Sequence, residues 1–439
     1  MRKSLLKRFG LVAATVLVCQ LAMAQQWTVT EMAAMPEAVS NNAVCEGFVG
    51  GVPYVYSFGG IDNTKAWAGI HLRSFRYNTD TDAWESIPDL PDTLGKIAAG
   101  ASQVDNIIYI IGGYHVHQNG NEYTSGKVHR YDCETNTYLS DGAEPPVAVD
   151  DHVQVVWRDS LIICITGWSG NGPSGTNVPD VQLYNPSTDS WQAGTSVPNN
   201  NDYKVFGASG TIVGDTVYYF GGARLGGSFP ASTSFVKGYI NPNDPTDITW
   251  ERVLPDPVSR GYRTAATQRY GHAYWLGGST ITFNYDGLAY TNNQPVPPAQ
   301  QVFSYSTYHG TWDTSTVALP MDLRGLAHID IDTRYIAGGM EAGPTVSDKT
   351  WKVEFSDVNL IGVAPRAGEL RVYPVPANDW LRVDLPGKWV GQVQLMNMHG
   401  QVLAASKDGR VDVSELPSGV YFLEAETEVG THRQLVTVR

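Results

Sequence analysis

The chain is organised around short apolar runs that end in a pair of glycines. Strings such as YVYSFGG, IIYIIGG and TVYYFGG consist mostly of apolar and aromatic residues and stop at the glycines. Apolar runs of this length that end at turn-forming residues predict β-strands. Six such runs recur about 53 to 61 residues apart, and their last glycines are Gly60, Gly113, Gly167, Gly222, Gly278 and Gly339. In the third run Thr166 replaces the first glycine.

A pair of aromatic residues follows most of these runs. In four units the two aromatics stand seven residues apart, at Tyr77/Trp84, Tyr131/Tyr138, Tyr184/Trp191 and Tyr305/Trp312. A fifth unit has a longer version that runs from Tyr239 to Trp250. The residues between are mainly Asn, Asp, Thr, Ser, Gly and Pro, which form turns. Each unit therefore predicts four short strands, which is the pattern of one β-propeller blade.

The combination of Gly-Gly with the seven-spaced aromatic pair resembles the kelch repeat, over about residues 27–356. The resemblance implies an all-β fold, a six-bladed kelch β-propeller within residues 25–356. The sixth unit has a third strand at 350–355 and no fourth, whereas Trp27 to Glu31 looks like a fourth strand without the first three. We therefore expect the N-terminal strand to close the last blade, since ring closure removes exposed sheet edges.

The end of the chain has a different pattern. Residues 357–369 look like a linker, and residues 370–439 alternate apolar and polar positions, which predicts a small C-terminal β-sandwich. YPVPANDWLRV and LPSGVYFLEAETEVG resemble the C-terminal sorting domain of type IX secretion (Por-type) in Bacteroidota, with Val375 where the family has Asn. The resemblance implies that the type IX secretion machinery is a partner of residues 370–439. The tail is then removed, and the passenger is secreted or attached to the outer-membrane surface. An ordinary adhesive β-sandwich is the alternative.

Residues 1–24 are typical of a Sec signal peptide. Four basic residues precede an apolar run from Leu11 to Ala22, and small residues stand at Ala22 and Ala24. The run is shorter than the ~20 residues that cross a bilayer, so we expect no membrane span after cleavage. Cleavage removes four cations and no anion, which takes the formal net charge from −14 to −18. Such a surface repels nucleic acid, which we exclude as a partner.

The mature chain gives little sign of metal or redox chemistry. Three cysteines remain, far apart and odd in number, so no disulfide framework is indicated, and no C-x-x-C motif supports a zinc site. His115 and His117 form a His-x-His pair after the second glycine pair. In an extended strand both side chains point the same way, but the third ligand is unassigned, with Glu122 and His152 as the candidates. We predict no metal and no cofactor.

Charged residues cluster at the predicted start of each blade's innermost strand, which lies at the mouth of the ring. They include four cations, one aspartate and one histidine: Lys96, Lys204, Arg263, Arg324, Asp151 and His152. On an acidic protein these cations would reverse the charge locally and attract an anionic ligand, such as an acidic sugar or an acidic peptide. The alternative is that each cation pairs with a neighbouring carboxylate for structural reasons.

The loops after the glycine pairs are long and rich in aromatic residues, and they share the face of the mouth. Trp67, Tyr114, His115 and Trp168 are the candidates for ligand contact. Exposed aromatics on loops suit stacking on sugar rings or anchoring a peptide. Packing of one loop on the next is the alternative for each of them.

These observations favour a secreted or cell-surface propeller that binds a glycan or a protein through its loop face. The sequence has no G-x-S-x-G motif and no cysteine–histidine pair whose spacing supports nucleophilic catalysis. We therefore expect a binding protein rather than an enzyme. A sugar-active enzyme that resembles the six-bladed sialic-acid mutarotases or epimerases is the first alternative, by fold alone. A structural or adhesion component is the second. A central mouth filled by its own side chains would favour the scaffold.

Overall fold

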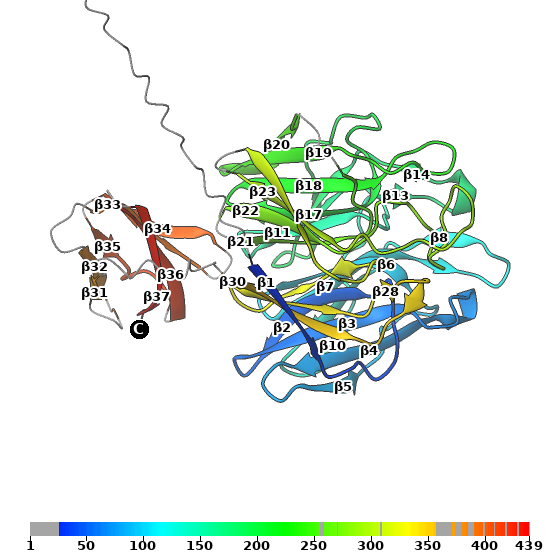
Figure 1. Ribbon diagram of the computed structural model, residues 1–439, viewed down its shortest axis with the longest axis horizontal. Helices are drawn as coiled ribbons and strands as arrows, with labels where there is room; N and C mark the ends of the chain where they lie inside the picture. The colour runs from blue at the N-terminus through cyan, green and yellow to red at the C-terminus, as the bar shows by residue number, and fades with distance from the viewer. Residues whose placement is uncertain are drawn as a thin grey trace, which may run out of the picture.

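The structure is a computed structural model that is built almost entirely of β-strands (Figure 1). It describes residues 26–438 except 255–258, 270, 308–309, 357–370, 374–376, 378, 385–389, 398–399, 408, 418 and 428–429. The expected signal peptide (1–24) and linker (357–369) lie outside the described residues. Two 3-10 helices occur in loops, η1 (Trp67–Gly69) and η2 (Gly172–Ser174).

Six blades of four antiparallel strands follow one another from β2 to β30, and the strands of each blade are ordered from the innermost outward. Blade 1 is β2 (Ala43–Val49), β3 (Val52–Ile61), β4 (Ile70–Asn78) and β5 (Ala83–Ile87). Blade 2 is β6 (Ile97–Val104), β7 (Ile107–Val116), β9 (Val128–Asp132) and β10 (Thr137–Tyr138), with β8 (Glu122–Thr124) beside β7. Blade 3 is β11 (Val153–Trp157), β12 (Leu161–Ile165), β15 (Val181–Asn185) and β16 (Ser190–Ala193).

The second half of the ring repeats this order. Blade 4 is β17 (Phe206–Val213), β18 (Thr216–Ala223), β19 (Phe235–Asn241) and β20 (Asp244–Arg252). Blade 5 is β21 (Ala265–Arg269), β22 (His272–Leu276), β23 (Gln301–Ser306) and β24 (Thr311–Thr316). Blade 6 is β26 (Ala327–His328), β27 (Thr333–Ala337), β30 (Thr350–Ser356) and β1 (Gln26–Met32). Short pairs stand in the loops, β13 (Trp168–Ser169) with β14 (Thr176–Asn177) and β28 (Met340–Glu341) with β29 (Thr345–Val346), while β25 (Arg324–Gly325) joins β2.

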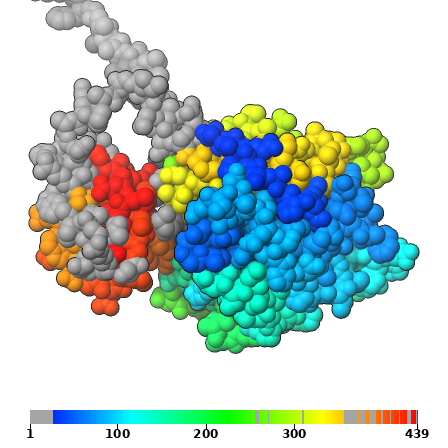
Figure 2. All heavy atoms as spheres, turned by 90° about the horizontal axis from the view of Figure 1, so that it is seen from below, coloured from blue at the N-terminus to red at the C-terminus, as the bar shows by residue number. Residues whose placement is uncertain are grey.

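The N-terminal strand is the outer strand of the last blade. β1 pairs antiparallel with β30 over its whole length, from Gln26 opposite Ser356 to Met32 opposite Thr350. Trp27 lies with its ring centroid 4.2 Å from that of Phe355. In the space-filling view the dark-blue N-terminal segment lies against yellow residues of the last blade (Figure 2). The ring is thus closed by strands from the two ends of the propeller segment.

The seven-residue aromatic spacing has a direct structural cause. Tyr77 lies opposite Trp84, and Tyr184 lies opposite Trp191, as cross-strand partners of the hairpin between a blade's third and fourth strands. Tyr131/Tyr138 and Tyr305/Trp312 are paired in the same way. The hydroxyl group of Tyr184 donates a hydrogen bond of 2.6 Å to Asp189 in the turn. Large cross-strand partners of this kind stabilise the hairpin and fill the space between blades.

The longer aromatic pair of blade 4 differs from the other four. Trp250 lies opposite Gly238, and Tyr239 lies opposite Thr249 and is exposed. A Cβ atom on Gly238 would come within 2.2 Å of the Trp250 ring. Glycine is therefore required at position 238, because the indole ring of Trp250 lies directly over its backbone and leaves no room for a side chain.

The tail folds as a separate sandwich of two sheets. One sheet has β31 (Arg371–Tyr373), β32 (Trp380–Asp384) and β35 (Arg410–Asp412), and the other has β34 (Val402–Ser406), β33 (Val390–Met396), β36 (Gly419–Thr427) and β37 (Gly430–Val438). Its apolar core includes Leu381, Leu395, Leu423 and Val436, and contains only residues of the tail. The propeller and the tail therefore have separate hydrophobic cores.

Candidate functional site

The loop-face end of the ring is tied together by six residues, one per blade, that we call the belt. All have φ between 47° and 67°: Asn41, Ala98, Asp151, Gly207, Arg263 and Asp322. Five of the six are not glycine, although left-handed backbone costs such residues roughly 1–2 kcal/mol each. A conformation repeated at the same place in every blade against this cost indicates a shared structural task.

That task is a continuous circuit of hydrogen bonds between neighbouring blades. The N–H of Asp151 donates to Ala98 O (3.0 Å), that of Gly207 to Asp151 O (2.8 Å) and that of Arg263 to Gly207 O (2.8 Å). The circuit continues from Leu323 N to Arg263 O (3.0 Å) and from Asn41 N to Asp322 O (3.4 Å). The N–H of Ala98 closes it by donating to the side-chain oxygen of Asn41 (2.9 Å). These hydrogen bonds bring the six belt residues close together around the axis at the loop-face end of the ring.

Side chains of the belt and its neighbour Arg324 fill this narrow ring, and we call them the plug (Asp151, Arg263, Asp322 and Arg324). Arg263 contacts Asp151 in a two-pronged pair, with Nε–Oδ1 at 3.1 Å and Nη2–Oδ2 at 2.7 Å, and reaches Asp322 with Nη1 at 2.9 Å. Arg324 Nη1 lies 2.8 Å from Asp151 Oδ1. The four residues are 0 to 8% exposed. Two cations and two carboxylates therefore balance each other in a sealed mouth.

The charges of the plug shift the titration of its carboxyl groups. Burial would raise the pKa of Asp151, but the Arg263 and Arg324 guanidinium groups outweigh it and hold that pKa below its usual range. Burial raises the pKa of Asp322, which Arg263 and the Ser40 hydroxyl only partly oppose. Asp150 stands beside the plug, and burial together with the charge of Asp151 raises its pKa well above the ordinary value.

An aromatic layer covers the plug on the loop side. The Arg263 guanidinium lies 5.3 Å from the ring centroid of Tyr262 and 5.6 Å from that of Phe283. Trp168 packs edge-on against Phe206 at 5.7 Å and Phe229 at 5.5 Å. Tyr114, another candidate, is 6% exposed, and burial raises its pKa well above the ordinary value. Tyr114 is thus buried and Trp168 is half-buried against these rings, and ligand contact by either residue stays a prediction.

The remaining candidates separate into two places. Lys96 is 1% exposed, and its Nζ lies 2.8 Å from Asp92 Oδ2 and 2.9 Å from His129 Nε2. Burial lowers the pKa of Lys96, whereas hydrogen bonds from His129 and Lys96 overcome burial and lower that of Asp92. Lys204 is half-buried, and its carbonyl oxygen accepts a hydrogen bond from Asn177 at 3.4 Å. Ligand contact by these cations stays a prediction, and the two arginines and Lys96 already have carboxylate partners.

The two histidines of the His-x-His pair have separate neighbours. Nδ1 of His115 donates to the carbonyl oxygen of Gly95 at 2.9 Å, while the His117 ring packs edge-on against Tyr123 at 4.7 Å. Burial lowers the pKa of His115. Among the described residues, no group of three or more His, Cys, Asp and Glu side chains is arranged to hold a metal ion.

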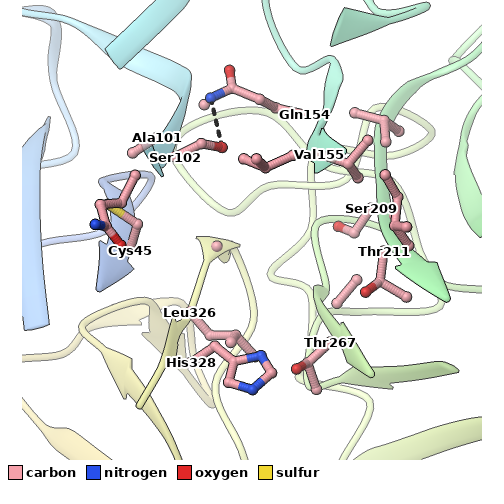
Figure 3. Close-up of a pocket in the computed structure, with 18 of the residues that line it drawn as sticks. Cys45, Ala101, Ser102, Gln154, Val155, Ser209, Thr211, Thr267, Leu326 and His328 are labelled. Atoms are coloured by element: carbon pink, nitrogen blue, oxygen red, sulfur yellow. Dashed lines mark hydrogen bonds between the residues drawn. The ribbon is translucent and has the colours of Figure 1, made fainter. Parts of the chain in front are cut away.

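Beyond the plug, the axis of the ring holds a cavity of about 310 Å³. The innermost strands line it, with Cys45, Ser102, Gln154, Ser209, Thr211, Thr267 and His328 around the open space (Figure 3). Its lining runs from Arg324 of the plug and the neighbouring His152 to Asp105, Asp159 and Gly214, which are exposed in the turns between first and second strands. The cavity is thus closed towards the loop face and reaches the opposite face, which we call the turn face.

The tail contributes to the rim of this cavity. Gln401 is among the lining residues, and Asn397 Nδ2 donates to Asp159 Oδ2 at 3.1 Å. A Cβ atom on Gly400 would come within 3.2 Å of the Gln268 amide nitrogen. Asn397, Gly400 and Gln401, between β33 and β34, therefore lie against the turn face.

The sequence interpretation missed the polar residues that line the cavity. Ser102, Ser209 and Thr211 lie in the middle of innermost strands, and Gln154 is the second residue of β11, so all four come after the charged candidates at the predicted strand entries. Their signal is polar residues inside otherwise apolar strands, as in AAGASQV and VQVVW. Such residues at the equivalent place of several blades face the axis, because the blades are arranged around it.

This geometry defines the class of protein, a closed β-propeller of six four-stranded blades followed by a β-sandwich. Within it, the kelch motif matches residues 98–139, and the secretion system C-terminal sorting domain matches residues 371–439. The chain is therefore a kelch-repeat β-propeller that carries a C-terminal sorting domain of type IX secretion. The predicted all-β propeller class is confirmed.

Similar proteins support the fold over parts of the chain. Kelch-like protein 36 of Bos taurus is 26% identical over 174 residues, which is 39% of this chain and 25% of that protein. Kelch-like protein terF of Aspergillus terreus is 25% identical over 273 residues, 59% of this chain and 53% of that protein. A solved structure described as "Structure of YjhT" has a TM-score of 0.58 and 14% identity, and the match covers 74% of this chain and 99% of that one. The chain thus matches between a quarter and about half of these two curated relatives, and the solved structure shows the fold alone.

The sorting domain implies export to the cell surface or beyond it and contact with the secretion machinery. In the described part of the chain, no helix has the length and apolar character needed to cross a membrane.

Proposed function

We propose that the exported propeller binds an extracellular protein or glycan through its loop face. The observation that carries this proposal is the distribution of exposed apolar side chains. Among the described propeller residues, eight large apolar side chains are exposed: Trp67, Leu94, Tyr123, Leu139, Leu225, Tyr239, Leu254 and Ile281. All except Tyr239 lie in connections between second and third strands or between successive blades. Both kinds of connection emerge on the loop face, because the strands of a blade alternate in direction.

Two of these side chains stand on regular secondary structure. Trp67 is 42% exposed on η1, and Tyr123, which is 36% exposed, lies on β8, itself paired to β7. The belt, the plug and the aromatic layer hold the loops from below. Exposed aromatics on a fixed platform bind partners at low entropic cost. The filled mouth weighs against the sugar-active enzyme, since its carboxylates are engaged in ion pairs. A filled mouth is also what a scaffold would have, and the exposed apolar side chains of the loops are the observation that favours a binding protein instead.

The test is the binding of the labelled full chain to a glycan array and to an array of purified extracellular proteins. We expect at least one ligand whose binding falls roughly tenfold in Trp67→Ala or Tyr123→Ala, the scale of a removed aromatic contact. Tyr239→Ala is the matched control, since this tyrosine is 52% exposed away from the loop connections. Equal loss in Tyr239→Ala, or no loss in the loop variants, would refute the proposal.

A further inference from the structure

The axial cavity has the hydrogen-bonding character of a ligand site. β6, β11, β17 and β21 each stand at one end of their sheets, and residues of all four line the cavity. A strand at the end of a sheet leaves one row of N–H and C=O groups without strand partners. The backbone therefore offers donors and acceptors to the axis from several blades at once.

The side chains in the middle of the cavity are mixed, and most of the polar ones are uncharged. Hydroxyl and amide groups come from Ser102, Gln154, Ser209, Thr211 and Thr267, and they alternate with apolar side chains such as Ala101, Val155 and Leu326 (Figure 3). Gln154 Nε2 donates to Ser102 Oγ at 2.9 Å across the boundary between blades 2 and 3. Among the charged lining residues, Arg324 pairs with Asp151, and Arg158 pairs with Asp215 at 3.1 Å. Glu46, in the middle of β2, accepts a hydrogen bond from the His328 N–H at 2.9 Å. Uncharged hydrogen-bonding groups next to one carboxylate favour a neutral hydroxylated ligand over an anionic one.

Two groups at the closed end of the cavity have hydrogen-bonding capacity to spare. His152 Nε2 lies 3.0 Å from Gln154 Oε1, so this nitrogen carries the proton and Nδ1 is an acceptor. Nδ1 of His152 and the Nε–H donor of Arg324 are both buried, and neither has a hydrogen-bond partner within the described residues. His152 is 3% exposed and Arg324 is 8% exposed. One acceptor and one donor without protein partners match the two-way hydrogen bonding of a hydroxyl group.

We propose that the axial cavity binds a small neutral polyhydroxylated molecule, a monosaccharide or a similar polyol, which enters from the turn face. The cavity volume is at the lower end of the range of small-molecule sites. The site is separate from the loop face, since the plug closes the ring between them. A protein could therefore hold a partner on one face and a sugar on the other.

The test uses saturation-transfer NMR on the full chain with D-glucose, D-galactose and D-mannose as neutral probes and D-glucuronate as the anionic probe. We expect binding of at least one neutral probe. Thr211→Trp, which places a large ring in the cavity, abolishes it, and Thr211→Val, which removes only the hydroxyl group, weakens it. Gln154→Leu is a second cavity variant, so the proposal remains testable if Thr211→Trp fails to fold. Each measurement is repeated with Gln401→Ala, which trims the side chain that the tail places at the rim.

Trp67→Ala is the control that separates the two sites. It leaves sugar binding in the cavity unchanged, while the cavity variants leave partner binding on the loop face unchanged. The proposal is overturned if no neutral probe binds in either background, if the folded cavity variants bind as the wild type does, or if D-glucuronate binds in preference to all three neutral sugars.

Discussion

The plug offers the sharpest test of how the ring is sealed. Arg263 is 1% exposed and bridges Asp151 and Asp322. Arg263→Met keeps most of the side-chain volume and removes the charge. Asp151 still has Arg324 at 2.8 Å, whereas Asp322, which is fully buried, keeps only the Ser40 hydroxyl group at 2.6 Å. The variant therefore isolates one uncompensated carboxylate inside the protein.

The expected cost is about 3–5 kcal/mol in the free energy of unfolding, the typical result of breaking a buried ion pair by removing one partner. Arg158→Met is the matched control, because Arg158 pairs with Asp215 at 3.1 Å while its side chain is 37% exposed. An exposed pair of this kind contributes at most about 1 kcal/mol. Urea denaturation followed by tryptophan fluorescence measures both values.

The pH dependence of Arg263→Met gives a second readout. The pKa of Asp322 is already raised in the folded protein, and Arg263 is the main group that opposes this rise. A raised carboxyl pKa favours the fold when the group is protonated, and this contribution is lost as the pH rises through the folded pKa. The cost of Arg263→Met therefore shrinks as the pH falls from 7 towards 5. A cost no larger than that of Arg158→Met, or one independent of pH, would refute the account of the plug.

Three further outcomes are expected, each measured by urea denaturation. Gly207→Ala costs about 2–4 kcal/mol, because φ is +67° and the new Cβ would lie 2.4 Å from Cε2 of the buried Tyr262; a cost below about 1 kcal/mol would contradict this. Asp150→Asn is as stable as the wild type at pH 7, and its stability falls less steeply as the pH rises, because burial raises the pKa of Asp150 in the wild type. A pH profile of stability identical to that of the wild type would contradict this. Trp27→Ala costs about 2 kcal/mol and exposes β1 to proteolysis, since the half-buried ring packs on Phe355; equal resistance to protease would exclude this role.

The repeat signals in the sequence determined most of the fold, because they are local. Tyr77 and Trp84 are seven residues apart and face each other across one hairpin, so their spacing predicts the turn and the register together. The same spacing rule failed for Tyr239 and Trp250, where the hairpin is longer and Gly238 takes the facing position. A longer hairpin changes which residues face each other across the two strands, although the same aromatic residue types are still present.

The candidate site was less predictable, because its contacts join distant blades. The sequence placed Arg263 and Arg324 at the mouth, but their partner Asp151 is more than a hundred residues away. No local pattern distinguishes a cation that meets a ligand from one that meets a carboxylate in space. The sequence also does not predict the left-handed backbone of Ala98, since the inter-blade hydrogen bonds that hold it form only when the ring closes.

The central claim is that the plug closes the ring at the loop face and that the axial cavity behind it is accessible from the turn face. The most direct measurement is the reaction of Thr211→Cys with iodoacetamide, followed by mass spectrometry of the folded full chain. The native Cys133 and Cys164 serve as internal references, since both are buried and burial raises their pKa values. The account predicts that the thiol at position 211 is modified while the two references stay intact. Protection of position 211 equal to that of the references would contradict it.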